Sequence, residues 1–474
     1  MTLWLGARVG QSYTQVHVSP GGRQGTSRER FWVVLTVTST FSSALGAALF
    51  ATLLTSGCGE SGDAGSGRED PLKQPHIVVV LVDQLRMDSM ERWAPNMTAL
   101  GKRGVSATHM RSVAPWTYPS VLSLFSGLYP QQHGADGEHD SNQLRIFDPD
   151  VVLFHEILQD NGYETAAFVT NPFLHNWNSF HEGFDTFDIH FIGNSHGVRG
   201  KPKKVWGPDM FADTVNMSIK DHFLERPVED PEFTYVHYID VHGPWGNAPF
   251  PGTYEDSIAW IDEKILELYE FMSDRYDGDV LFFVTSDHGQ ALDDDEDIGV
   301  GPDWRANKHS VFDFNLRIPF LLLPSNLVTE PRVLTAPCSN VDVLPTLLDW
   351  LDLDAPVPLP GVSLLPSIQD GATLSQDRLL YSRTSAFGSS SDCIVRGDRK
   401  SMRFFDPRSN VKLDQSSYDL LSDPRETETL GEDHWGFASE FIEAAGPHGV
   451  AFRPVLENLD PKVQEALQEL GYLK

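Results

Sequence analysis

Three apolar runs constrain the fold of this chain more than any other feature. Ile77–Val82 (IVVVLV) is continuous and β-branched, and Val280–Thr285 (VLFFVT) and Phe233–Ile239 (FTYVHYI) have a similar character. Runs of this length are typical of strands buried on both faces of a mostly parallel sheet. We therefore predict an α/β fold with a large, mostly parallel mixed sheet flanked by helices.

Acidic and imidazole side chains follow each of these runs. Asp83 comes directly after the first run, Asp287 and His288 follow the second, and Asp240 and His242 follow the third. Ligands of open α/β sheets bind just beyond the carboxyl ends of the strands. We therefore expect these side chains at one edge of the sheet.

Asp83, Asp287 and His288 have the ligand atoms that divalent cations such as Ca, Mg, Mn or Zn prefer. Each residue alone also fits a strand-end cap or an ordinary hydrogen-bonded histidine. The three together favour a metal site. A cation there would lower the pKa of a hydroxyl nucleophile and neutralise an incoming oxyanion.

Helical patterns lie between and after the strands. Apolar residues at helical spacing predict an amphipathic helix packed on the sheet, and they are Ile258, Ile261, Ile265, Leu268 and Met272. A second helix is predicted near the end of the chain, from Asp460 to Gly471, with a cap, an early Pro and a closing Gly. The acidic run Asp293–Asp297 fits a solvated loop better than a cation site.

The first 75 residues are predicted to lie outside the catalytic fold. Phe31–Leu54 is apolar and uncharged, follows several arginines, and ends in Thr-Ser-Gly-Cys at Cys58. This pattern favours an exported lipoprotein attached to the cell envelope through Cys58, while an uncleaved membrane anchor or a simple cleaved signal stays open. Gly59–Gln74 is rich in Gly, Ser and charge, which predicts a flexible linker.

These features divide the chain into a signal or anchor at 1–58, a linker at 59–75, a catalytic domain at 76–375 and a C-terminal subdomain at 376–474. The formal charge of −31 argues against a nucleic-acid-binding surface, because such surfaces use Lys and Arg to neutralise phosphates. Three cysteines exclude a disulfide framework and a four-cysteine zinc site.

Several motifs, in this order, resemble the sulfatase branch of the alkaline phosphatase superfamily. They are IVVVLVDQLRMD at 77–88, APWTYPSVLSLFSGLYPQQHG at 114–134, HYIDVHGPW at 237–245, VTSDHG at 284–289 and NVDVLPTLLDWL at 340–351. The resemblance covers residues 76 to about 430 and implies a smaller C-terminal sheet that includes Ile394–Lys400.

The nucleophile motif departs from the sulfatase pattern. In sulfatases a Cys or Ser in Cys/Ser-x-Pro-x-Arg becomes formylglycine, whereas this chain has Thr117, Pro119 and Val121 at those places. The family's Lys and His of a GKWH pattern are replaced by VTNPF at 169–173. Thr117 resembles the nucleophile of superfamily members that attack phosphorus with a threonine alkoxide. The alternative is that Thr117 only caps a helix predicted over Ser120–Ser126.

The resemblance also implies roles for other residues. Lys308 matches a lysine that contacts the substrate oxyanion, and His242 matches a histidine that contacts the oxyanion or leaving group. Gln84 stands where a further metal ligand is usual. A second ion would have Asp240, His242 and His309 as its ligands.

The leading hypothesis is an exported, metal-dependent hydrolase or transferase of an anionic phosphoester, with a diester favoured. A sulfatase that uses Thr117 directly is the second hypothesis. The third is a binding protein with the same fold and no turnover.

Overall fold

The structure is a computed structural model of the chain. It describes residues 15–17, 36–38, 74–135, 146–174, 178–190, 210–243, 252–292, 310–323, 330–385, 390–405, 412–437 and 439–440. The chain forms two compact units, residues 1–69 and residues 70–474. In the first unit, β1 (Gln15–His17) pairs antiparallel with β2 (Thr36–Thr38).

None of the helices in the described ranges is long and apolar enough to cross a membrane. The apolar run at 31–54, apart from β2, and Cys58 lie outside the described residues. Export and lipid attachment therefore stay predictions.

An eight-stranded mixed sheet forms the centre of the second unit, in the order β11-β4-β10-β9-β3-β8-β6-β7. Only β10 runs antiparallel to its neighbours, so the predicted mostly parallel sheet is confirmed. The strands are β3 (His76–Val82), β4 (Val105–Ala107), β6 (Glu164–Val169), β7 (Thr186–Ile189), β8 (Glu232–Tyr238), β9 (Val280–Thr285), β10 (Phe320–Leu323) and β11 (Arg332–Leu334).

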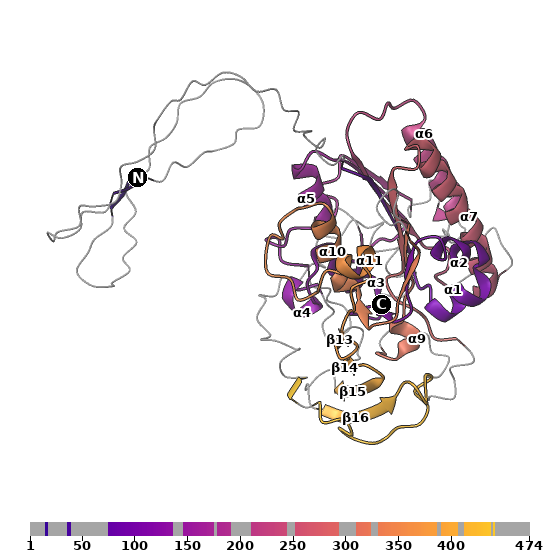
Figure 1. The fold of residues 1–474 in the computed structure, drawn as a ribbon, viewed down its shortest axis with the longest axis vertical. Helices are drawn as coiled ribbons and strands as arrows, with labels where there is room; N and C mark the ends of the chain where they lie inside the picture. Colours follow the sequence, from indigo (N-terminus) through magenta and orange to yellow (C-terminus); the bar gives the residue numbers. More distant parts are fainter. Residues whose placement is uncertain are drawn as a thin grey trace, which may run out of the picture. The chain divides into compact units, whose positions relative to one another are not determined.

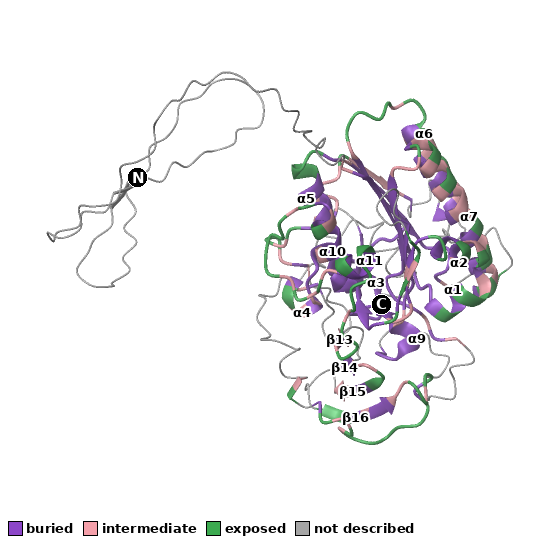
Figure 2. Cartoon of the chain, in the orientation of Figure 1, coloured by how far each residue is buried: buried purple, intermediate pink, exposed green. Residues whose placement is uncertain are grey.

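Helices cover both faces of this sheet (Figure 1). One face packs against α1 (Met87–Trp93), α2 (Pro95–Gly101), α6 (Ala212–Phe223) and α7 (Tyr254–Arg275). The other packs against α3 (Thr117–Ser126), α5 (Phe154–Asp160), α10 (Val343–Trp350) and α11 (Leu365–Gln369). Because side chains of a strand alternate between faces, β3 buries three residues in each of the two cores. Figure 2 shows the sheet as the most continuously buried part of the molecule.

The predicted amphipathic helix is α7, and all five of its apolar positions are fully buried. Its N-cap is Thr253, whose hydroxyl accepts a hydrogen bond from the Asp256 N–H. The helix begins where the cap satisfies a main-chain donor that has no partner inside the helix.

Helix α3 begins at Thr117, three residues earlier than predicted, and ends at Ser126. Pro119 does not prevent this early start, because the N–H groups of the first helical turn have no intrahelical partner. Gly127 closes the helix in the left-handed conformation, with φ of 67°, which costs a glycine little. The Ser123 carbonyl accepts the Gly127 N–H there.

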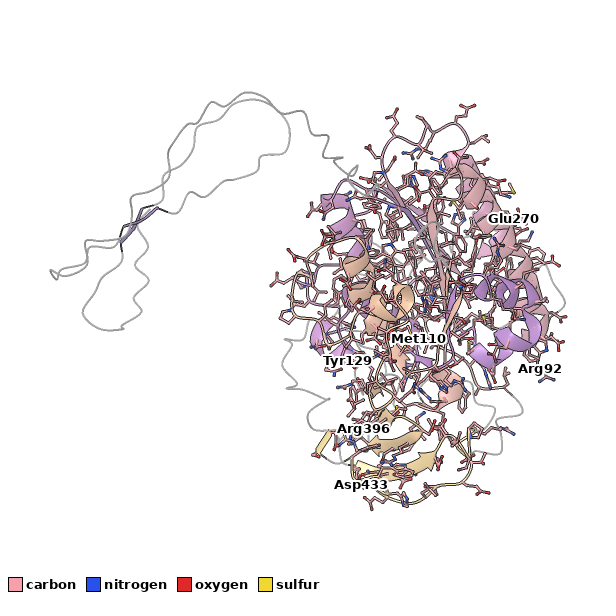
Figure 3. All side chains as sticks on the ribbon, viewed as in Figure 1. Arg92, Met110, Tyr129, Glu270, Arg396 and Asp433 are labelled. Carbon is pink, nitrogen blue, oxygen red and sulfur yellow. The ribbon has the colours of Figure 1, made fainter. Side chains whose placement is uncertain are left out.

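A four-stranded antiparallel sheet follows, in the order β13-β14-β15-β16. Its strands are β13 (Leu379–Thr384), β14 (Ser390–Arg396), β15 (Arg399–Phe405) and β16 (Lys412–Asp419). This confirms the predicted smaller sheet, and the expected range Ile394–Lys400 contains the β14–β15 hairpin turn. Figure 3 shows Arg396 and Asp433 in this C-terminal region, away from Arg92 and Glu270 on helices α1 and α7.

Short elements complete the second unit. They are β5 (Met110–Arg111), α4 (Pro130–His133), α9 (Asp313–Leu316), β12 (Cys338–Ser339) and the 3-10 helix η4 (Asn340–Asp342). Cys338 and Cys393 are buried, free thiols. The predicted terminal helix at 460–471 and the acidic run at 293–297 lie outside the described residues.

Candidate active site

The structure brings the three predicted metal ligands together. Strands β9, β3 and β8 are neighbours, so their carboxyl ends meet at one edge of the sheet. His288 Nε2 lies 3.8 Å from Asp83 Oδ1 and 3.5 Å from Asp287 Oδ2. All three residues are buried. Two ligand atoms bound about 2.1 Å from one ion stand about 3.0–4.2 Å apart, so both separations fit a shared cation.

Thr117 lies against this group. Its hydroxyl donates to Asp83 Oδ2 across 3.4 Å, a long hydrogen bond. Thr117 is the first residue of helix α3, and the N-cap position belongs to Trp116. The alternative that Thr117 only caps the helix is therefore wrong. The first turn of α3 leaves N–H groups and the positive end of the helix dipole beside the Thr117 hydroxyl.

Asn171 is a site residue that the sequence analysis missed. It follows β6, and its side-chain Nδ2 donates to Asp83 Oδ2 across 2.8 Å and to Thr117 Oγ1 across 3.5 Å. The Phe173 N–H donates to Asn171 Oδ1 across 2.9 Å, which fixes the orientation of the amide. The place of Asn171 in VTNPF, where the family has GKWH, was the available signal.

Hydrogen bonds hold the ends of β3 and β9 to each other and to α3. The Gln84 N–H donates to Asp287 Oδ1 across 3.1 Å, and the Leu85 N–H donates to Ser286 Oγ across 3.0 Å. Ser120 Oγ, one turn after Thr117, donates to the Asp287 carbonyl across 2.6 Å. The nucleophile candidate and the metal-ligand candidates therefore share one rigid frame.

His237 is the second residue that the sequence analysis missed. Its Nε2 lies 3.7 Å from Asp83 Oδ2, and Asp83, His237 and Asp287 offer ligand atoms that all lie within 4.8 Å of one another. Burial lowers the pKa of His237 to about 4, although the carboxylate of Asp287 raises it. The available signal was a histidine inside the buried run at the end of β8, in register with Leu81.

The chemistry of these donors fits a divalent cation. Gln84 Oε1, His237 Nε2 and Asp287 Oδ2 are buried, and in the described part of the chain none of them has a hydrogen-bond partner. Buried polar atoms are normally hydrogen-bonded, and leaving one unpaired costs about 1–3 kcal/mol. A cation bound by the group of Asp83, His237 and Asp287 would satisfy His237 Nε2 and Asp287 Oδ2.

Of the three residues predicted to bind a second ion, the structure describes Asp240 and His242, and each makes hydrogen bonds outside the metal-ligand group. Asp240 Oδ1 accepts hydrogen bonds from the Ala212 N–H at the start of α6 and from the Trp260 indole. Burial raises the pKa of Asp240 to about 7. The His242 ring shares a hydrogen bond of 2.6 Å with the Gly243 carbonyl, so its Nδ1 carries the proton. Lys308 and His309 lie outside the described residues.

The sulfatase family model matches residues 75–353, more than half of the chain. An ulvan-active sulfatase of Formosa agariphila is 23% identical over 365 residues, which cover 64% of this chain and 66% of that protein. A Caenorhabditis elegans homologue of an extracellular sulfatase is 23% identical over 62% of this chain and 49% of its own length. The chain thus spans two thirds or less of these two curated relatives.

Solved structures share the fold. A sulfatase structure from work on glycosaminoglycan metabolism by Bacteroides thetaiotaomicron matches with a TM-score of 0.59 and 19% identity, over 78% of this chain and 99% of that one. The phosphonate monoester hydrolase of Agrobacterium radiobacter matches with a TM-score of 0.59 and 16% identity, over 79% and 96%. The family model and the shared alkaline phosphatase-like fold lead to one conclusion: this chain belongs to the sulfatase family.

Proposed function

We propose that this sulfatase-family hydrolase cleaves phosphoesters with Thr117 as the nucleophile and a divalent cation as cofactor. The observation that carries the proposal is the Thr117 hydroxyl, which sits at the first residue of α3 and donates to Asp83. Asp83 belongs to the cluster of buried carboxylates and imidazoles described above. A hydroxyl beside these ligand atoms would lie next to an ester that a bound cation holds.

Asp83, Asp287 and His288 would hold the cation, and Gln84 Oε1 is a neutral oxygen suited to complete the set. When bound, a divalent cation supplies a lower pKa for a nearby hydroxyl and charge neutralisation for a phosphoryl oxyanion. Asp240 Oδ1 accepts hydrogen bonds from Ala212 and Trp260, whereas Asp240 Oδ2 is buried and has no hydrogen-bond partner among the described residues.

The protein residues divide the remaining work. Asp83 Oδ2 accepts a hydrogen bond from the Thr117 hydroxyl and would so orient Oγ1 for attack on phosphorus. Asn171 Nδ2 lies within hydrogen-bond distance of both atoms and is a donor for a developing oxyanion. His242 and Lys308 keep the roles that the family resemblance implies, at the leaving group and the oxyanion. Attack of Oγ1 on phosphorus would break the bond from phosphorus to one alcohol of the ester, which departs as the first product. Thr117 would remain phosphorylated until water or an acceptor alcohol displaces it from phosphorus.

Phosphorus is favoured over sulfur because Thr cannot give the formylglycine aldehyde. A sulfated threonine would lack the easy elimination of sulfate that a formylglycine hydrate allows. The fold shared with a phosphonate monoester hydrolase is compatible with attack on phosphorus. Direct attack on a sulfate ester by Thr117 is the second candidate, since the curated relatives include sulfatases.

The charge of the site favours an ester with a single negative charge, such as a phosphodiester. Val121 and Asn171 are neutral at places where sulfatases carry Arg and Lys. One divalent cation balances Asp83 and Asp287, which leaves Lys308 as the only cation that the resemblance assigns to the substrate. A dianionic monoester would then carry more charge than the site neutralises, and burying an unbalanced charge is costly.

We also propose that the chain is exported and attached to the cell envelope through a lipid on Cys58. The basic and apolar pattern before Cys58 supports this. Labelled palmitate should enter the mature protein and be lost in Cys58→Ser. A mature N-terminus at another residue would contradict lipid attachment.

The test of the enzymatic proposal compares aryl phosphate diesters, aryl phosphate monoesters and an aryl sulfate on the metal-loaded protein. We expect the diester to be cleaved fastest. Thr117→Ala should abolish turnover with unchanged thermal unfolding, while Thr117→Ser keeps a hydroxyl and should keep measurable activity. Mass spectrometry of acid-quenched diester reactions should find one phosphoryl group, still carrying the remaining ester substituent, on the Thr117 peptide. Fastest cleavage of the aryl sulfate, abolished by Thr117→Ala, would contradict the phosphoester proposal.

A further inference from the structure

We propose that His237 is a direct ligand of the same cation, held in the ligating tautomer by Thr170. Together with His288 it gives the site two imidazoles, which selects a transition-metal ion such as Zn²⁺ over Ca²⁺ and Mg²⁺. This inference rests on the metal site of the proposed function and adds His237 to the ligands predicted from the sequence, Asp83, Asp287 and His288.

The position of His237 follows from the strand pairing. His237 lies opposite Leu81 in the parallel β3–β8 ladder, two residues before Asp83 along β3. Leu81 and Tyr235 belong to the core beneath α3, and side chains two residues apart on a strand share a face. Asp83 and His237 therefore project toward the face of the sheet that carries Thr117. Their nearest atoms, Asp83 Oδ2 and His237 Nε2, are 3.7 Å apart.

Thr170 decides which ring nitrogen of His237 carries the proton. Its hydroxyl donates to the His237 main-chain carbonyl across 2.8 Å and lies 3.1 Å from His237 Nδ1. A hydroxyl has one proton to donate, so the Thr170 oxygen can only accept from the ring. Nδ1 therefore carries the proton in the neutral ring, and Nε2 has a free lone pair.

His288 has the same arrangement. Its Nδ1 lies 2.7 Å from the Gly289 carbonyl, an acceptor, so Nδ1 carries the proton and Nε2 has the lone pair. The two Nε2 atoms face the two oxygens of Asp83, at 3.7 Å for His237 and 3.8 Å for His288.

A nitrogen lone pair and a carboxylate oxygen that face each other repel, unless a cation lies between the two atoms. A direct N–H···O bond is not the explanation, because 3.7 and 3.8 Å exceed the range of about 2.7–3.2 Å for such bonds. Both separations are those expected for two atoms bound to one ion.

The donor set then indicates the kind of ion. Ca²⁺ and Mg²⁺ take oxygen ligands almost exclusively, whereas imidazole suits Zn²⁺ and related ions. Two imidazoles and two carboxylates are an ordinary donor set for Zn²⁺. Thr170 is a positioning residue here, comparable to the partners that orient metal-bound histidines in other proteins, whose loss typically costs about 10–100-fold in affinity.

The experiment measures metal ligation and needs no substrate. The full chain is stripped of metal, loaded with Zn²⁺ and studied by X-ray absorption, which counts imidazole ligands, and Zn²⁺ affinity is measured against a chelating dye. We expect two imidazoles in the wild type and one in His237→Ala, with at least about a 100-fold loss of Zn²⁺ affinity. Thr170→Val should bind Zn²⁺ about 10–100-fold more weakly than the wild type, and Thr170→Ser should keep most of the wild-type Zn²⁺ affinity. His222→Gln on α6 is the matched control and should keep two imidazoles.

The outcomes separate this inference from the proposed function. A wild-type protein that binds Zn²⁺ with one imidazole or none overturns the role of His237 and leaves the proposed metal site standing. Tighter binding of Ca²⁺ than of Zn²⁺ overturns the metal preference. Equal affinity in Thr170→Val and wild type overturns the role of Thr170, and this measurement does not depend on His237→Ala remaining folded. A wild-type protein that binds no divalent cation contradicts the proposed function itself.

Discussion

The Tyr254 hydroxyl donates to the main-chain carbonyl of Gln84 across 2.8 Å. The Tyr254 hydroxyl oxygen also accepts a hydrogen bond from the Arg86 N–H across 3.1 Å. One phenol at the start of α7 therefore bridges both sides of the turn that follows β3. Gln84 has φ of 65°, a left-handed conformation that non-glycine residues adopt at a cost. Tyr254 thus stabilises the strained residue whose main-chain N–H donates to Asp287 Oδ1.

Tyr254→Phe removes both hydrogen bonds and leaves the Gln84 carbonyl and the Arg86 N–H buried without this partner. We expect the free energy of unfolding to fall by about 1–3 kcal/mol, measured by urea denaturation. Tyr269→Phe is the matched control, because the Tyr269 hydroxyl accepts a long, solvent-exposed hydrogen bond of 3.4 Å from Arg103. The control should change stability by less than about 0.5 kcal/mol. An equal loss in both variants would contradict the role given to Tyr254.

Local sequence was sufficient to predict the frame of the site. The runs at 77–82 and 280–285 are continuous enough to indicate buried strands, and the residues that follow a parallel strand meet at a known edge. The sequence alone therefore places Asp83, Asp287 and His288 together.

His237 and Asn171 could not be predicted in the same way. The role of His237 depends on the register between β3 and β8, a contact between segments more than 150 residues apart. Asn171 contacts Asp83 only because β6 lies beside β8 in the sheet. Strand order is a tertiary property, and neither residue type nor local spacing determines it. The helix was predicted from Ser120, whereas α3 already begins at Thr117, because Pro119 fits the first turn of a helix.

Lys400 ties the C-terminal sheet to the rest of the second unit. Its buried ammonium lies 2.7 Å from Asp313 Oδ1 and 2.7 Å from Glu426 Oε1. Lys400→Met removes the cation between these two buried carboxylates, so that Asp313 keeps its pair with Arg111 and the Glu426 carboxylate keeps only the hydrogen bond from the Asp313 N–H within the described part of the chain. We expect a loss of about 3–5 kcal/mol in the free energy of unfolding, measured by denaturant titration.

Lys412→Met on β16 is the control for that prediction. Lys412 pairs with Glu432 where both side chains are exposed to solvent, by 41% and 65%. An exposed ion pair contributes about 0–1 kcal/mol, so the control should remain close to the wild type. Comparable losses in the two variants would mean that the buried network around Lys400 has no special importance.

His133 should make the protein sensitive to acid. Burial lowers its pKa to about 3, from about 6.5 in an unfolded chain, and its Nδ1 accepts the Ala135 N–H across 3.1 Å. Between these two pKa values the unfolded state binds the proton and the folded state does not. The contribution of neutral His133 to the free energy of unfolding is therefore complete above pH 6.5, and it falls as the pH drops toward 3.

Because of this single residue, the free energy of unfolding should be about 2 kcal/mol lower at pH 5 than at pH 7. The measurement is the difference in unfolding free energy between pH 7 and pH 5, for the wild type and for His133→Gln. A smaller pH difference in His133→Gln is expected, whatever its stability at pH 7. An unchanged difference would show that other groups cause the acid sensitivity.

Removing the metal should destabilise the wild type and leave an Asp83 variant unaffected. An ion that binds only the folded state adds about 2.7 kcal/mol at a concentration 100 times its Kd, so a chelator should lower the melting temperature. Asp83→Asn removes one of the two buried carboxylates of the metal-ligand group and should abolish the chelator effect.

The melting temperature of Asp83→Asn carries further information. In the metal-free wild type, Asp83 and Asp287 are two like charges in one buried cluster, which repel each other. Asp83→Asn relieves this repulsion, so it should melt at or above the temperature of the metal-free wild type and below that of the metal-loaded one. Thermal unfolding with and without chelator, at equal protein concentration, measures all three values. If Asp83→Asn keeps a full chelator effect, Asp83 is not a ligand, and the cation binds elsewhere in the chain.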